Sequence, residues 1–134
     1  MATVLLDTDV FSFLLKSDSR ASAYIPLTQG QRFALSFMTV AELFQWARVR
    51  KWGTRRFSHL EQAIAACVIL PSDMEMCRLW AQVRYERQSI GRPIAPQDAW
   101  VAATGLRHNL PLVTHNASDF ERITNLAVRT ATVP

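Results

Sequence analysis

The chain contains few cysteines and no long hydrophobic run. Its 134 residues include only two cysteines, Cys67 and Cys77, both in apolar stretches. Two thiols are too few for a disulfide-stapled fold, and with the three histidines they show none of the spacings of a zinc site. The longest apolar runs, such as 63–70, fall far short of the ~20 residues that a bilayer requires. The composition therefore predicts buried free thiols and no membrane segment.

The N-terminal segment also lacks the features of a secretory signal. It has no basic region, and Asp7 interrupts its short apolar stretch. With 49% hydrophobic and 19% charged residues, the chain is neither disordered nor fibrous in character. A length of 134 residues corresponds to one domain, so residues 1–134 are expected to form a single cytoplasmic domain.

Lysine is scarce although the net charge is +4. Of the fifteen basic residues, only Lys16 and Lys51 are lysines, and the other thirteen are arginines. The planar guanidinium of arginine donates paired hydrogen bonds to phosphate, which favours a phosphate-bearing partner. A genomic bias toward arginine codons explains the same composition, so charge alone does not decide between the two explanations.

Short apolar runs alternate with segments of helical spacing along the whole chain. The runs expected to form strands are 3–6, 33–36, 68–70, 112–114 and 126–129, and the expected helices are 10–15, 20–29, 39–51, 55–66, 73–88 and 97–108. Asp9, Thr39 and Ser72 are expected to cap three of these helices. This alternation predicts an α/β fold with a mostly parallel sheet of four to five strands covered by helices.

Four acidic residues follow the expected strands or begin the expected helices. They are Asp7, Glu42, Asp98 and Asp119. Ligands of parallel sheets bind beyond the carboxyl ends of the strands, so these carboxylates are expected to share one cleft. Each also has a structural explanation, because Glu42 completes a capping box with Thr39 and the others suit helix starts or turns.

Taken together, the four acids indicate a metal site. Crowded carboxylates repel one another unless a cation or protons compensate their charge. Mg²⁺ is a hard cation that accepts carboxylate, water and phosphate oxygens. An acidic metal pocket on a basic protein suits hydrolysis of a phosphodiester.

The order of the motifs resembles the PIN-domain ribonucleases, and more narrowly the VapC toxins of bacterial toxin–antitoxin pairs. The matching segments cover nearly the whole chain: Leu5-Leu-Asp7-Thr-Asp9, Thr39-Val-Ala-Glu42-Leu43, Pro96-Gln-Asp98-Ala-Trp-Val-Ala-Ala103, and Thr114-His-Asn116-Ala-Ser-Asp119-Phe120. The resemblance implies a three-layer α/β/α sandwich. It also implies an endoribonuclease that uses Mg²⁺, or Mn²⁺, to cut structured RNA such as transfer RNA or a ribosomal RNA loop.

The same resemblance implies roles for individual residues and for partners. By position, Asp7, Glu42 and Asp98 match metal-binding acids, and Asp119 matches a more variable fourth acid. Thr8, Thr39 and Asn116 match polar residues that orient such ligands. Asp9 stands where the family often has asparagine and is interpreted as a helix cap. A homodimer and a VapB-like antitoxin that blocks the pocket are implied as well, and the apolar helix 73–88 is the expected dimer surface.

Two further features leave alternatives open. Trp46, Trp52 and Phe57 surround the basic stretch 48–56. They form either the core of a helical hairpin, a stacking surface for single-stranded RNA, or a groove for an antitoxin helix. His115 adjoins the last acidic loop and is either a substrate contact or a surface residue.

Two other functions compete with the nuclease. Asp7-Thr-Asp9 resembles the opening of haloacid-dehalogenase-type phosphatases, but Phe11 departs from that motif and neither lysine is suitably placed. A catalytically silent PIN-like module that binds RNA or protein is the second rival. Asparagine in place of Asp7 or Asp98 would favour it, and both aspartates are present.

Overall fold

A parallel sheet of five strands forms the centre of the protein. In this computed structural model, which describes residues 1–131, the strand order is β3-β2-β1-β4-β5 and every neighbouring pair is parallel. The strands are β1 (Thr3–Leu6), β2 (Arg32–Ser36), β3 (Val68–Leu70), β4 (Leu112–Val113) and β5 (Val128–Arg129). The predicted α/β fold is confirmed, and the sheet is entirely parallel where a mostly parallel one was expected.

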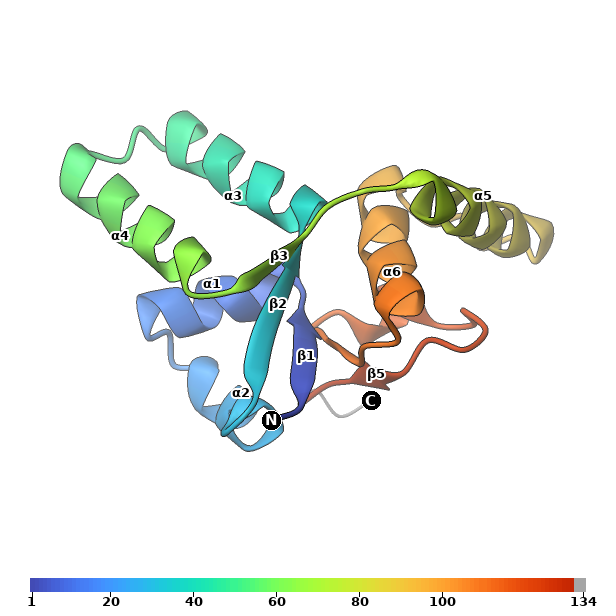
Figure 1. Cartoon of the computed structure of the whole chain (residues 1–134), viewed down its shortest axis with the longest axis horizontal. Coiled ribbons are helices and arrows are strands. Elements are labelled where there is room, and N and C mark those ends of the chain that lie inside the picture. The colour runs from blue at the N-terminus through green and yellow to red at the C-terminus, as the bar shows by residue number, and fades with distance from the viewer. Residues whose placement is uncertain (132–134) are drawn as a thin grey trace.

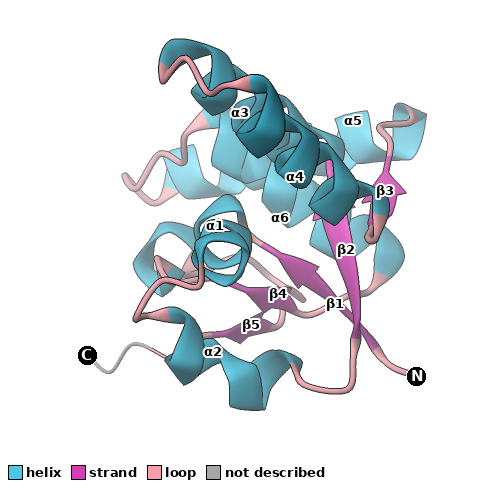
Figure 2. Cartoon of the chain, turned by 90° about the vertical axis from the view of Figure 1, so that its left-hand side faces the viewer, coloured by secondary structure: helices cyan, strands magenta, loops and turns pink. Residues whose placement is uncertain are grey.

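Helices cover both faces of this sheet. On one side lie α1 (Thr8–Lys16), α2 (Ala21–Thr28), α3 (Phe37–Val49) and α4 (Thr54–Ala65). On the other side lie α5 (Met74–Ser89), α6 (Pro96–His108) and the short 3-10 turn η1 (Ala117–Phe120). Figure 1 shows the two groups on opposite sides of the strands, and Figure 2 shows α1 and α2 in front of them. The three-layer sandwich is therefore confirmed.

Alternating side chains of the central strand connect the sheet to two separate cores. Val4 and Leu6 pack with the α1–α4 side, whereas Leu5 packs with α5 and α6. All three are completely buried, which is the pattern expected of a parallel strand covered on both faces. The sheet thereby holds the carboxyl end of β1 in a rigid position between the two helical layers.

Three predicted helix caps are wrong by one to three residues. The N-cap of α1 is Asp7 and not Asp9, because the Asp7 carboxylate accepts from the Thr8 amide. α3 begins after Ser36, whose hydroxyl accepts from the amide of Met38, so Thr39 lies inside the helix. Asp73, not Ser72, caps α5. The sequence offered two or more capping residues within one turn at each site, and the backbone path out of the preceding strand selects one.

The α3–α4 hairpin has its aromatic side chains half-buried against the core. Trp46, Trp52 and Phe57 pack on the α1–α4 core, and the rings of Phe44 and Phe57 are stacked with centroids 5.8 Å apart. The structure supports the core interpretation for the inner faces of these rings. Among residues 1–131, no helix is long and apolar enough to cross a membrane.

Candidate active site

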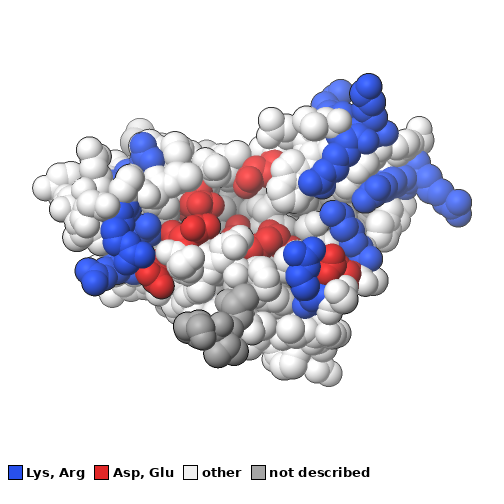
Figure 3. Space-filling view, turned by 180° about the vertical axis from the view of Figure 1, so that it is seen from behind, with Lys and Arg blue, Asp and Glu red and all other residues white. Residues whose placement is uncertain are grey.

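The four sequence-predicted acids come from four different elements and meet at the carboxyl edge of the sheet. Asp7 directly follows β1, Glu42 lies on α3, Asp98 is in the first turn of α6, and Asp119 is in η1. Burial is the largest cause of the raised pKa of the Asp98 carboxyl, and the charges of the other three acids raise it further, which places all four within one electrostatic neighbourhood. Figure 3 shows acidic side chains in the hollow in the middle of the back face, with lysine and arginine side chains toward both ends.

Asp7 is the most enclosed of the four. It is 8% exposed, and its two oxygens accept from the Thr8 amide at 2.9 Å and from the Thr114 hydroxyl at 2.8 Å. Burial raises the pKa of the Asp7 carboxyl, while both hydrogen bonds oppose that rise. These two donors fix the orientation of the carboxylate at the end of β1.

Glu42 is held by a buried pair of threonines. The Thr8 hydroxyl donates to Glu42 Oε1 at 3.2 Å and lies 3.1 Å from the hydroxyl of Thr39. Burial raises the pKa of the Glu42 carboxyl, and the nearby charge of Asp7 adds to the effect. Thr39 is therefore a buried partner of Thr8 and not part of a capping box, so Glu42 is free of the structural role that the sequence offered for it.

Among residues 1–131, no hydrogen-bond donor holds the Asp98 carboxylate. Its side chain is half-buried, and burial together with the charges of Asp7, Asp119 and Glu42 raises its pKa to about 7. The positive charge of Arg87 only partly offsets this effect. A carboxylate in this position is destabilised until a cation or a proton reaches it.

Asp9 ties the last acidic loop to α1. One Asp9 oxygen accepts from the His115 amide at 3.1 Å and from the Asn116 side-chain amide at 3.0 Å. The Asn116 amide in turn donates to the Thr114 hydroxyl at 3.1 Å. Burial, together with the charge of Asp7, raises the pKa of Asp9 to about 7. The interpretation of Asp9 as the α1 cap is wrong, and its contacts position the loop that leads to Asp119.

Arg87 is a buried residue of this region that the sequence did not reveal. It is 5% exposed, and its guanidinium donates to the carbonyls of Arg92, Asp119 and Glu121. These bonds anchor the η1 loop on α5. Its position among thirteen arginines carries no signal in the sequence, because only the packing of α5 on the loop distinguishes it.

His115 is packed and not a free surface residue. Its ring lies edge-on to Phe13 and Tyr24, with centroids 5.2 and 5.7 Å away, and its Nδ1 is 2.6 Å from the Tyr24 hydroxyl oxygen. These contacts hold the side chain against the α1–α2 side of the loop. The ring therefore helps to fix the start of the loop that carries Asn116.

The chemistry of the four acids fits a divalent cation. Within residues 1–131, no carboxylate of the four lies within 4.0 Å of a lysine or arginine nitrogen. In the same residues, no three Asp, Glu, His or Cys side chains are arranged to enclose one ion unaided. Mg²⁺ usually takes one or two carboxylates and completes its coordination shell with water and substrate phosphate. A site in which the protein supplies only some of the ligands is therefore expected for this ion.

Comparison with known proteins agrees with this geometry. The PIN domain family model matches residues 4–126. The chain is 30% identical to Ribonuclease VapC1 of Haemophilus influenzae strain R2866, over 91% of this chain and 92% of that protein. It is 28% identical to the tRNA(fMet)-specific endonuclease VapC of Shigella flexneri, over 94% and 96%.

Solved structures show the same likeness. The toxin–antitoxin structure VapBC-1 from nontypeable Haemophilus influenzae matches with a TM-score of 0.82 and 26% identity, over 96% of this chain and 98% of that one. The match extends over nearly the full length of both chains, so the strands and the helices on both faces are shared. The chain belongs to the PIN-domain family and, within it, to the VapC ribonucleases.

Proposed function

We propose that this nuclease is a Mg²⁺-dependent endoribonuclease toxin that cleaves structured RNA in the cytoplasm. The observation that carries the proposal is the convergence of four carboxylates at the carboxyl edge of the sheet, none of which has a lysine or arginine nitrogen within 4.0 Å among residues 1–131. Such an arrangement is costly in the free protein and becomes favourable when a divalent cation binds. Mn²⁺ has the same preference for oxygen ligands and is expected to substitute.

In this proposal the acids have distinct roles. Asp7, Asp98 and Glu42 would hold the ion, partly through coordinated water, and Thr8, Thr39 and Thr114 keep two of these carboxylates oriented through the hydrogen bonds described above. When bound, Mg²⁺ polarises the phosphoryl oxygen and lowers the pKa of a coordinated water.

Asp119 and Asn116 act on the substrate side of the pocket. Asp119 lies on the exposed rim, where its carboxylate either supports a second ion or orients the attacking water in line with the scissile bond. In-line attack by water leaves 5′-phosphate and 3′-hydroxyl ends. Asn116, held by Asp9, keeps this rim in place.

The substrate proposed is a transfer RNA or a ribosomal RNA loop. A relative named a tRNA(fMet)-specific endonuclease supports the first. The basic side chains at both ends of the acidic hollow suit a folded RNA that spans it (Figure 3).

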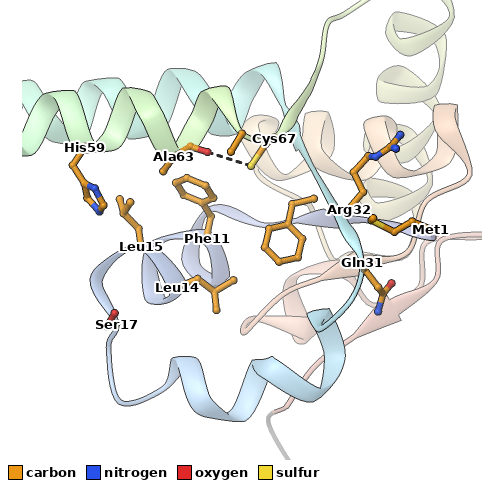
Figure 4. Close-up of a pocket in the computed structure, with 12 residues that line it drawn as sticks. Met1, Phe11, Leu14, Leu15, Ser17, Gln31, Arg32, His59, Ala63 and Cys67 are labelled. Carbon is orange, nitrogen blue, oxygen red and sulfur yellow. Dashed lines mark hydrogen bonds between the residues drawn. The ribbon is translucent and has the colours of Figure 1, made fainter.

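A VapB-like antitoxin is the proposed protein partner, because the solved relatives include VapBC complexes. The structure offers an apolar hollow of about 670 Å³ between α1, α4 and the start of β2. Phe11, Leu14, Leu15 and Ala63 line it together with Phe33 and Cys67 (Figure 4). A cleft of this kind accepts the apolar face of an amphipathic helix. A Leu14→Glu substitution is expected to abolish co-purification with the antitoxin while the toxin stays folded.

A homodimer is proposed through α5. Met74 and Tyr85 on this helix are each 69% exposed, and Ile90 directly after it is 44% exposed. A Tyr85→Asp substitution is expected to convert a dimer to a monomer in a light-scattering measurement. An unchanged mass would remove α5 from the interface.

Cleavage of total cellular RNA by the purified, antitoxin-free protein tests the nuclease proposal. Discrete fragments are expected with Mg²⁺, and none with EDTA or with Asp98→Asn. Glu61→Gln is the matched control, because Glu61 is an exposed acid on α4 outside the acidic hollow. Cleavage that survives EDTA, or that persists in Asp98→Asn, would refute the proposed mechanism. A folded native protein that neither cleaves RNA nor responds to Mn²⁺ would favour the catalytically silent binding module.

A further inference from the structure

A group of basic side chains lies where the C-terminal ends of α1 and α3 meet the start of α4. Lys16 ends α1, Arg50 follows α3, and Arg56 lies in the first turn of α4. Lys16 and Arg56 line one small hollow of about 240 Å³, together with Trp52 and His59. We call Lys16, Arg50, Arg56 and Trp52 the hairpin cluster.

The arginines of the hairpin cluster are held by aromatic rings and not by acids. The Arg56 guanidinium carbon lies 4.0 Å from the centre of the Trp52 ring, and that of Arg50 lies 5.0 Å from the centre of Trp46. Within residues 1–131, none of Lys16, Arg50 and Arg56 has a carboxylate within 4.0 Å. The nearby Asp18 is already bound to Arg20 at 2.9 Å. The rings orient the guanidinium groups without neutralising them.

The cations of the hairpin cluster repel one another. The pKa of Lys16 is lowered by burial and by the charges of Arg50 and Arg56, and Asp18 only partly compensates. Such a group of cations is stabilised when an anion binds among them. Guanidinium groups present flat, paired donors that match phosphate.

The cluster and the acids are connected along two helices. Lys16 is nine residues along α1 from Asp7, and Arg50 is eight residues beyond Glu42 on α3. At 1.5 Å per residue, each path spans about 12–14 Å. At about 3.4 Å per nucleotide, this corresponds to roughly four nucleotides of a stacked strand. A strand cleaved at the acids therefore has the length to reach the hairpin cluster.

We infer that the hairpin cluster is a phosphate-binding site for the RNA strand, about four nucleotides from the bond that is cut. The inference rests on the proposed function, since it assigns a second contact to the same substrate. It gives the outer faces of Trp46 and Trp52 a role in orienting arginines, while their inner faces stay in the core. Backbone contacts of this kind fix where a substrate lies without reading its bases.

Binding to mixed transfer RNA tests the inference. All proteins carry Asp98→Asn so that the probe is not cut, and the test protein adds Arg50→Gln and Arg56→Gln. The matched control adds Arg32→Gln and Arg78→Gln, which remove the same charge at the start of β2 and on α5. Melting temperatures confirm that each protein is folded.

The test protein is expected to bind RNA with a Kd about tenfold higher than that of the control. The slope of log K against log salt concentration is expected to be smaller by about 1.5, because two phosphate contacts are lost. In the cleavage-competent background, KM is expected to rise while kcat is unchanged. Equal Kd values in test and control would overturn the inference. So would a variant that keeps its RNA affinity but loses affinity for a polyglutamate peptide, because the site would then belong to an acidic protein segment.

The two proposals can fail separately. RNA that binds through the hairpin cluster but is not cleaved by the native chain would leave the inference standing and refute the nuclease mechanism. Cleavage by the native chain, with KM unchanged when Arg50 and Arg56 are replaced, would refute only the inference.

Discussion

Replacing Asp98 with asparagine is expected to stabilise the metal-free protein while it removes activity. The pKa of this carboxyl rises from an ordinary 3.8 to about 7, first because of burial and then because of the neighbouring acids. A difference of this size corresponds to about 4 kcal/mol of destabilisation when the group is ionised. Because Asp98 is only half-buried, screening by water reduces this to about 2 kcal/mol. The loss of a favourable charge at the start of α6 subtracts about 0.3–1 kcal/mol, which leaves a net gain of about 1 kcal/mol.

The stability gained by replacing Asp98 with asparagine increases with pH. Between the unfolded and folded pKa values the native state binds more protons than the unfolded state, so its stability falls as the pH rises from about 4 to about 7. Above that window the penalty is complete. In EDTA at about pH 8, Asp98→Asn is expected to melt about 3–5 °C above the native chain, and this gap narrows toward about pH 5.

Thermal melting in EDTA and in millimolar Mn²⁺ measures both effects. The ion is expected to raise the melting temperature of the native chain and to have little effect on Asp98→Asn. Asp18→Asn is the matched control, because the Arg20 side chain beside Asp18 holds the pKa of that carboxyl below its usual range. The Asp18→Asn substitution is expected not to raise the melting temperature in EDTA. A lower melting temperature of Asp98→Asn in EDTA at pH 8 would show that the protein itself compensates this carboxylate, and would refute the reasoning.

Three further substitutions test how the site is supported, each by urea denaturation. Gly105→Ala is expected to cost about 1–2 kcal/mol, because the added Cβ would lie 2.8 Å from Leu126 Cδ1 and 3.3 Å from the Leu110 carbonyl; an unchanged midpoint would contradict this. Arg87→Met is expected to cost about 3 kcal/mol by leaving three carbonyls of the adjoining loops without their donor. Asp9→Ala is expected to cost about 1–2 kcal/mol and to lower kcat, because the loop after β4 loses two hydrogen bonds to α1. Full activity of Asp9→Ala would show that the loop after β4 keeps its active position without these two hydrogen bonds.

The sequence was sufficient to predict the fold and the neighbourhood of the acids. Short continuous apolar runs identify strands that are buried on both faces, and apolar residues at helical spacing identify helices that bury one side. The alternation of the two then requires a parallel sheet. Since parallel strands end at one edge, residues that follow them are neighbours whatever their separation in sequence. Asp7 and Asp119 are 112 residues apart and were expected together for this reason. The binding of metal by these acids remains a prediction.

Local patterns were less reliable where several residues could do the same task. Ser36 and Thr39 are both suitable N-cap residues for α3. The direction of the backbone at the end of β2 determines that Ser36 is the one that caps the helix. Asp9 satisfies the sequence rule for a cap, yet its side chain bonds to a loop more than a hundred residues away. Nothing within one turn of Asp9 signals that partner.

The sequence by itself determined the order of strands and helices, the two-sided core and the set of acids at one edge. These features follow from two general constraints. Burial requires apolar residues throughout a strand or on one face of a helix, and parallel strands all end at the same edge of the sheet. The tertiary structure alone decided that Arg87 anchors the η1 loop, that Asp9 holds Asn116, and that Lys16, Arg50 and Arg56 share one surface. Each of these depends on distances between side chains of separate elements. Such distances are set by how helices pack on the sheet, which a local pattern does not encode.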